Sequence, residues 1–194
     1  MGLGAIQPTV LIIPGLRDHV ADHWQTLLHV RLAGQGRKVR SVAPMGRANL
    51  DCASRVEAIE REMLAIEGAV VAVAHSGGCV ALAHWARMWK GRVWGALLAT
   101  PPDFEEAMPA GYPRLDELHA GGWLPVPRRH LPFPSIVAAS RNDPLGRYER
   151  VAELAHDWGS RLVDLGEVGH LNPEFGFGTW YSAENYIDHI ALAA

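Results

Sequence analysis

Residues 70–82 read VVAVAHSGGCVAL, two apolar runs joined through a serine that lies among small residues. The first run favours a strand covered on both faces, because it is apolar at nearly every position rather than at every second one. The second run favours a helix that is buried around most of its circumference. A buried strand that turns directly into a buried helix is typical of a parallel sheet with helices on both faces.

The same alternation of apolar strands and longer helices extends from this stretch in both directions. The predicted strands are Val10–Pro14, Val39–Ala43, Ala69–Ala74, Val93–Ala99, Ser135–Ala139 and Arg161–Leu165. The predicted helices are His19–Gly34, Ala53–Ile66, Gly77–Met88, Tyr148–Trp158 and Thr179–Ala191. We therefore expect one three-layer α/β domain over residues 1–194, with about six mostly parallel strands and helices on both faces.

The helix predicted at Ala53–Ile66 is amphipathic. Its apolar residues recur at helical spacing, at Val56, Ile59, Met63 and Ile66. Charged residues, Arg55 among them, lie between these positions. The pattern predicts one face packed on the sheet and Arg55 on the polar remainder of the helix.

Residues 101–134 break the alternation, because they are rich in proline and glycine and lack long periodic runs. A single short helix is predicted within them, at Leu115–His119. Their scattered apolar residues predict an irregular excursion rather than a large cap domain. Five aromatic residues are candidates for the lining of an acyl pocket, with packing as the favoured alternative: Phe104, Trp123, Phe175, Phe177 and Trp180.

The composition is that of an ordinary globular protein. Of the 194 residues, 48% are apolar and 20% are charged, and the formal net charge is -3. Such a charge does not attract nucleic acid or an anionic membrane. The two cysteines, Cys52 and Cys79, cannot form a disulfide framework, and neither signal-peptide nor membrane-spanning patterns are present. We expect a cytoplasmic protein with no nucleic-acid or membrane partner.

Ser76 lies in the pattern Ala-x-Ser-x-Gly, with Ala74 and Gly78 two residues to either side. This is the pattern of a nucleophile elbow, in which larger side chains at those two places would collide with the neighbouring strand and helix. Such a turn exposes Ser76 Oγ at the sheet edge and directs the N–H of Gly77 toward a developing oxyanion. The alternative is an ordinary strand-to-helix turn in which Ser76 caps the helix.

A serine nucleophile needs a base and a group that orients the base. Asp143 follows a predicted strand in the run SRNDP, and His170 follows the next one in the run GEVGHLN. The order serine, acid, histidine is that of the α/β-hydrolases. Asp143 in an Asx-turn and His170 as an exposed loop residue are the alternatives, and Asp103 is a competing acid that we rank below Asp143.

An oxyanion hole needs a second N–H, donated from the loop after the first strand. That strand breaks into Pro14-Gly15-Leu16, and the N–H of Leu16 is the predicted donor. The alternative is an ordinary Pro-Gly turn.

No metal or other cofactor is predicted. His19 and His23 have the spacing that places two ligands on one helix face, but no glutamate follows His19 and no third ligand is evident. His75 is expected to form a local hydrogen bond and to take no catalytic step.

The chain resembles the retinoblastoma-binding-protein-9-like family of small serine hydrolases, a subgroup of the α/β-hydrolases. The segments that carry the resemblance are spread over nearly the whole chain: Ile13–Leu16, His23–Gln25, Ala74–Cys79, His84–Trp85, Leu131–Ser135, Ala139–Pro144, Gly169–Asn172 and Gly176–Trp180. The resemblance implies a triad of Ser76, Asp143 and His170, a compact α/β-hydrolase fold without a large cap, and no cofactor. One departure is Ala74, where many members carry glycine.

These residues predict a serine hydrolase that cleaves a small ester, thioester or amide through an acyl-enzyme on Ser76. Two alternatives stay open. One is a non-catalytic interaction module on a hydrolase fold, since a fold does not guarantee an activity. The other is acyl transfer or lyase chemistry with the same triad. A protein partner cannot be read from the sequence.

Overall fold

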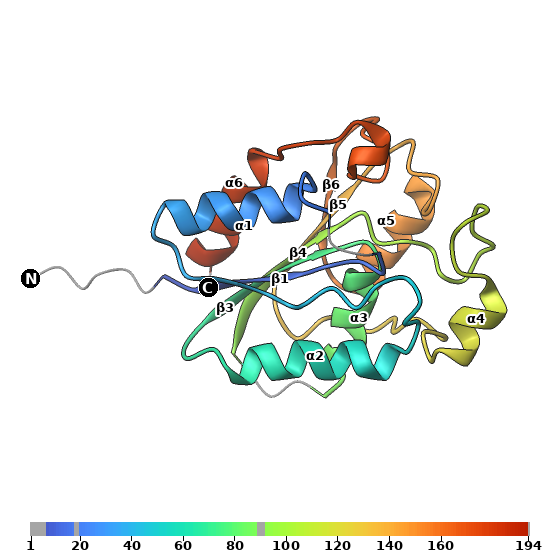
Figure 1. The fold of residues 1–194 in the computed structure, drawn as a ribbon, viewed down its shortest axis with the longest axis horizontal. Coiled ribbons are helices and arrows are strands. Elements are labelled where there is room, and N and C mark those ends of the chain that lie inside the picture. The colour runs from blue at the N-terminus through green and yellow to red at the C-terminus, as the bar shows by residue number, and fades with distance from the viewer. Residues whose placement is uncertain (1–6, 18–19, 89–91, 194) are drawn as a thin grey trace, which may run out of the picture.

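The computed structural model describes residues 7–17, 20–88 and 92–193 (Figure 1). All six predicted strands are present, and together they form one parallel sheet. Their bounds are β1 Thr9–Ile13, β2 Val39–Ser41, β3 Val70–His75, β4 Val93–Ala99, β5 Ser135–Ala139 and β6 Arg161–Asp164. The prediction of a parallel α/β sheet is confirmed.

The strand order is β2-β1-β3-β4-β5-β6. The second strand, β2, lies on one side of β1. The third, β3, lies on the other side of β1, and β4, β5 and β6 follow outward from it. In open parallel sheets, ligands bind in the crevice at the carboxyl ends of the strands where the strand order reverses. In the register of β1 and β3, Ile13 pairs with Ala74, so the loop after β1 starts beside the turn that carries Ser76.

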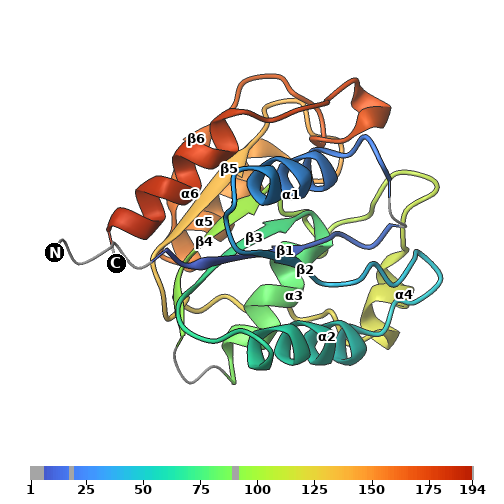
Figure 2. The same cartoon turned by 60° about the vertical axis from the view of Figure 1, so that its left-hand side comes forward.

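Helices cover both faces of the sheet (Figure 2). One face carries α1 Trp24–Gly34 and α6 Ser182–Leu192, and the other carries α2 Cys52–Leu64, α3 Gly77–Ala86 and α5 Tyr148–Asp157. Successive residues of β3 serve the two layers in turn. Val71 and Val73 belong to the core under α1 and α6, whereas Val70, Ala72 and Ala74 belong to the core under α2 and α3. This two-sided burial explains why the strand is apolar at nearly every position.

Helix α1 starts later than the sequence predicts. Its first residue is Trp24, and His23 caps it by accepting a hydrogen bond from the N–H of Gln25 on Nδ1 at 3.2 Å. Residues 20–22 lie in a turn before the helix, and His19 lies outside the described residues. The other long helices match their predicted bounds to within a few residues, as is usual for helix ends.

Arg55 is the clearest departure from the predicted helix faces. The sequence placed it on the polar side of α2, but only 6% of its surface is exposed. Its guanidinium turns toward the loops beside Ser76 and donates to their backbone carbonyls. The 3.6-residue period describes the direction in which a side chain leaves its helix, and a long side chain can still bury its end under a neighbouring loop.

The excursion of residues 101–134 packs against the body of the protein and forms no large cap. It contains α4 Leu115–Ala120, and it contributes Leu118, Trp123 and Val126 to the core shared with α2 and α3. The indole N–H of Trp123 donates to the carbonyl of Leu50 at 2.7 Å. Most of the large apolar side chains of the excursion are thereby used in packing.

Candidate active site

Ser76 occupies a strained turn between β3 and α3. Its φ of 54° and ψ of -133° lie in a region that non-glycine residues rarely adopt, at a cost of about 1–3 kcal/mol. Two backbone hydrogen bonds hold it there: Ser76 donates to Ala99 at 2.9 Å, and Cys79 donates to Ser76 at 2.9 Å. Strain of this kind persists where the surrounding structure imposes it, and it is frequent at functional sites.

The small residues around Ser76 are required by the close approach of the loop after β1. A Cβ on Gly78 would lie 2.5 Å from the carbonyl oxygen of Pro14. A Cβ on Gly77 would lie 2.7 Å from Cγ of Leu16. Ala74, the residue that replaces the more common glycine, is fully buried. The Ala-x-Ser-x-Gly pattern therefore has the geometric role that the sequence predicts for it.

The structure brings Ser76, His170 and Asp143 together. His170 Nε2 lies 2.8 Å from Ser76 Oγ, and His170 Nδ1 lies 2.8 Å from Asp143 Oδ2. The side chains of His170 and Asp143 are almost completely buried, whereas Ser76 is half-buried at the sheet edge. A carboxylate can only accept, so Nδ1 carries the proton and Nε2 is left to accept from the serine hydroxyl.

The loop of His170 is held by two polar side chains that the sequence analysis did not single out. Asn142 Oδ1 accepts from the N–H of Gly169 at 2.7 Å, and Ser140 Oγ accepts from the N–H of Val168 at 3.2 Å. Ser140 also donates to Asn142 Oδ1 at 2.9 Å. The run SRNDP thus supplies both the carboxylate and the contacts that fix the loop opposite it. The sequence signal for Ser140 and Asn142 is the cluster of short polar residues that directly follows a buried strand.

His75 supports His170 from the other side. Its Nε2 lies 2.9 Å from the carbonyl oxygen of His170, and the two ring centroids are 5.0 Å apart. Burial lowers the pKa of His75 well below its usual range, and the neighbouring His170 and His23 lower it further. The sequence leads to the expectation of a local hydrogen bond, whereas the neutral His75 donates from Nε2 to His170, which lies 95 positions further along the chain.

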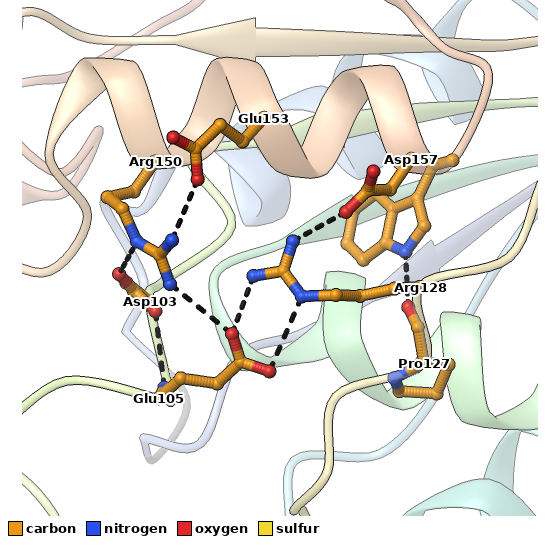
Figure 3. Close-up of polar contacts among 8 residues, drawn as sticks. Asp103, Glu105, Pro127, Arg128, Arg150, Glu153 and Asp157 are labelled. Atoms are coloured by element: carbon orange, nitrogen blue, oxygen red, sulfur yellow. Dashed lines mark hydrogen bonds and ion pairs between the residues drawn. The ribbon is translucent and has the colours of Figure 1, made fainter.

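Asp103, the competing acid, belongs to a different cluster (Figure 3). Its carboxylate accepts from Arg150 Nε at 2.8 Å and from the N–H of Glu105 at 3.2 Å. Arg128 extends the same network, because it bonds both Glu105 and Asp157. These ion pairs fasten the excursion to α5, and the carboxylate of Asp103 is engaged with Arg150 rather than with His170.

The two segments that carry the predicted oxyanion donors, Leu16 and Gly77, both border Ser76. Gly77 is the first residue of α3, where an N–H has no partner within the helix. Gly15, which precedes Leu16, runs so close to the nucleophile that a Cβ on it would lie 3.0 Å from Ser76 Cβ and 3.5 Å from Ser76 Oγ. The structure thus places the predicted donor segment directly beside the serine.

Ser76 and His170 open into a cleft of about 660 Å³, within the usual range for small-molecule sites. Its lining mixes apolar side chains with charged ones at the rim, including Leu16, Phe104, Met108, Leu145, Arg17 and Glu174. Of the aromatic residues considered from the sequence, Phe104 lines the cleft. Trp123 and Trp180 are buried in the two cores instead.

The part of the chain that the structure describes contains no candidate metal site and no candidate membrane span. No group of three or more histidine, cysteine, aspartate or glutamate side chains there could hold a metal ion. None of the described helices is long and apolar enough to cross a membrane.

The chain is similar in structure to several solved proteins. A YdeN-like hydrolase from Pectobacterium atrosepticum has a TM-score of 0.79 and 28% identity, over 96% of this chain and 92% of that one. The ydeN gene product of B. subtilis has a TM-score of 0.75 and 19% identity, over 95% and 98% of the two chains. The α/β hydrolase domain-containing protein 10 from mouse has a TM-score of 0.67 and 13% identity, over 87% and 84%. A comparison with curated proteins gives no match.

The sheet order, the helices on both faces and these structural neighbours define an α/β-hydrolase fold without a large cap. The family model described as serine hydrolase matches residues 10–189. The chain belongs to this serine hydrolase family.

Proposed function

We propose that this hydrolase cleaves a small carboxylic ester, thioester or amide through a covalent acyl-enzyme on Ser76. The observation that carries the proposal is the unbroken hydrogen-bonded path from Asp143 through His170 to Ser76, with both contacts at 2.8 Å. The path ends on a hydroxyl that a strained turn presents to a cleft of about 660 Å³. A binding module has no need for a serine, a histidine and a carboxylate in this order and geometry.

In the first half of the reaction, Ser76 Oγ attacks the substrate carbonyl while His170 Nε2 takes the hydroxyl proton. Asp143 keeps the Nδ1–H tautomer of His170 and stabilises the imidazolium that forms. The N–H groups of Leu16 and Gly77 donate to the oxyanion of the tetrahedral intermediate. His170 then gives its proton to the departing alcohol, thiol or amine, and the acyl group stays on Ser76.

In the second half, a water molecule attacks the acyl carbonyl and gives a proton to His170 Nε2. The same two N–H groups receive the second oxyanion. Ser76 leaves with the proton from His170, and the carboxylic acid is released. Each step uses only side chains and backbone groups of this site and water.

A fluorophosphonate probe tests the proposal. The probe should phosphonylate Ser76 and no other serine, because among the described serines Ser76 is the one whose partner histidine is itself oriented by a buried carboxylate. Peptide mapping by mass spectrometry identifies the modified residue. The Ser76→Ala protein should take up no label, and equal labelling of that variant would refute the assignment.

We further expect a preference for short acyl groups. Each CH₂ buried by an acyl tail would add about 0.8 kcal/mol, so an enzyme with a tail pocket shows kcat/KM that rises steeply with chain length. Here Leu118, Trp123 and Val126 of the excursion pack into the core, and charged groups such as Arg17 and Glu174 stand in the cleft wall. The value of kcat/KM should therefore stay level or fall beyond roughly six carbons.

A series of 4-nitrophenyl esters from acetate to palmitate measures this preference, with each ester kept below its critical micelle concentration. A maximum at decanoate or longer would mean that the excursion acts as a true lid. Such a result would change the proposed substrate and leave the proposed chemistry intact.

The residues of the site also suggest where the chain lies within the serine hydrolase family. The residues around Ser76, Asp143 and His170 resemble the retinoblastoma-binding-protein-9-like serine hydrolases, and we propose that the chain stands close to them within the serine hydrolase family.

A further inference from the structure

The guanidinium of Arg55 is buried against two loops that border the cleft. Nη1 donates to the carbonyl of Gly15 at 3.2 Å, and Nη2 donates to the carbonyl of Leu16 at 3.3 Å. On the second loop, Nη2 donates to Gly46 at 2.9 Å and to Asn49 at 2.8 Å. Every one of these acceptors is a backbone carbonyl. Among the described residues, no ion pair with a carboxylate includes Arg55.

Burial of the Arg55 guanidinium lowers the stability of the fold. A buried cation without a carboxylate partner loses hydration that neutral carbonyls replace only in part. Burial accordingly lowers the pKa of Arg55. An apolar residue at this position of α2 could pack there without the desolvation cost of a buried cation. We therefore infer that the guanidinium is needed to hold the two loops whose carbonyls it contacts.

Apart from Arg55, the loop after β1 is held by side chains: Arg17 pairs with Glu174 at 3.1 Å and lies over the Tyr112 ring, and the Leu16 side chain packs against the core. Within the described residues, no backbone–backbone hydrogen bond involves residues 14–17. The Gln25 side chain donates to Ile13 at 3.0 Å and to Val73 at 3.1 Å, but these carbonyls precede the loop. The carbonyls of Gly15 and Leu16 are held by Arg55.

The orientation of the Gly15–Leu16 peptide follows from this contact. The peptide is trans, so its C=O and its N–H point in opposite directions. With the oxygen of Gly15 turned to Arg55, the N–H of Leu16 points away from Arg55. A flipped peptide would put a carbonyl oxygen, rather than a donor, in the place where the substrate oxyanion forms.

We propose that Arg55 is a positioning residue that holds the Gly15–Leu16 peptide with its N–H directed into the oxyanion hole beside Ser76. Arg55 touches neither the substrate nor the reacting atoms. It acts through the loop, and it ties that loop to residues 46–49, of which Arg47 lines the cleft. The inference rests on the proposed function, because it assigns a role to a group that supports the oxyanion.

The Arg55→Gln variant should lose transition-state stabilisation and keep ground-state binding. Removal of an oxyanion-hole donor costs about 10²–10³ in kcat, and a donor that is only mispositioned should cost part of this. We expect kcat per active site to fall by about 10- to 100-fold while KM changes by less than about 3-fold. Arg55→Lys should be intermediate, since one ammonium retains the charge but cannot reach the carbonyls of both loops.

A trifluoromethyl ketone separates positioning from general damage to the structure. Ser76 Oγ forms a bond to the ketone carbon, the carbonyl π electrons move to oxygen, and the hydroxyl proton passes to His170. The resulting oxyanion needs the same hole as the transition state. In Arg55→Gln the inhibition constant should rise by the same factor by which kcat/KM falls. End-point titration with a fluorophosphonate gives the concentration of active sites for both measurements.

Arg92→Gln is the matched control. Arg92 also donates a guanidinium N–H to a backbone carbonyl, that of Ile66 at 3.2 Å, but this contact lies beyond the other end of α2. Its replacement should leave kcat, KM and the inhibition constant of the ketone within about 2-fold of the wild-type values.

Each outcome decides the inference. Unchanged kcat per active site and unchanged ketone affinity in Arg55→Gln would overturn it, even if fewer molecules are active. If neither Arg55→Gln nor Arg55→Lys folds, as judged by circular dichroism, Arg55 serves folding as a whole and the inference is also overturned. A wild-type protein that takes up no fluorophosphonate on Ser76 would instead refute the proposed function.

Discussion

The Ser76→Ala variant should fold normally and lose hydrolysis by a factor of about 10⁴ or more. The Oγ of Ser76 contacts His170 at 2.8 Å and Ser76 is only partly buried, so removal of the hydroxyl leaves no unsatisfied group beyond one ring nitrogen of His170 at the cleft. Alanine has the same Cβ as serine and can occupy the same strained turn. The loss should therefore appear in kcat, without a large shift in the melting temperature.

Steady-state rates with 4-nitrophenyl acetate and a thermal melt measure the two quantities on the same preparation. Ser135→Ala is the matched control, because Ser135 lies at the start of β5 and its hydroxyl bonds Ser160 at 2.6 Å, away from the cleft. It should stay within about 2-fold of wild-type activity. Residual hydrolysis by Ser76→Ala above roughly one hundredth of wild type would exclude Ser76 as the nucleophile.

Asp143→Asn should preserve the fold and lower kcat by about 10³- to 10⁴-fold. The carboxylate accepts from His170 Nδ1 on one oxygen and from the N–H of Leu145 on the other, at 2.8 and 2.9 Å. An amide that keeps the contact to Leu145 turns its NH₂ toward His170 Nδ1. His170 must then carry its proton on Nε2, where it can no longer accept from Ser76.

Asp103→Asn provides the comparison, since it makes the same chemical change at the competing acid. It weakens the contact to Arg150 in a partly exposed ion-pair network, so kcat/KM should fall by less than about 3-fold. The two variants are assayed with the same ester. A large loss in Asp103→Asn together with a mild effect of Asp143→Asn would reverse the assignment of the acid.

Much of the fold could be predicted because it depends on short-range patterns. The four central strands, β1, β3, β4 and β5, are apolar over several successive positions, whereas the edge strands β2 and β6 are short and partly polar. The long helices show their apolar residues at helical spacing or contain runs of small residues. The sequence predicts too early a start for α1, because His23, a residue without a strong capping preference, caps the N-terminus of the helix with its ring nitrogen. Helix ends depend on such single contacts, and these leave little trace in a local pattern.

In the candidate site, too, some residues could be predicted from the sequence and others could not. Ser76 could be recognised because the elbow needs small residues at fixed distances along the chain, and Gly78 meets that need directly under the carbonyl of Pro14. Asp143 and His170 could be ranked by their order and by the strands that precede them. The sequence ranks Asp143 above Asp103 as the acid but does not decide between them, because both aspartates follow strands of the same sheet.

The sequence by itself determined the local elements: a buried strand that must turn sharply at Ser76, and loops with an aspartate and a histidine after two later strands. Only the tertiary structure decided which carboxylate faces His170, and that Arg55 leaves an apparently polar helix face to hold the carbonyls of Gly15 and Leu16. The reason is physical. Propensity and periodicity act between residues a few positions apart, whereas hydrogen bonds between side chains and distant loops depend on how the elements pack, which no local pattern encodes.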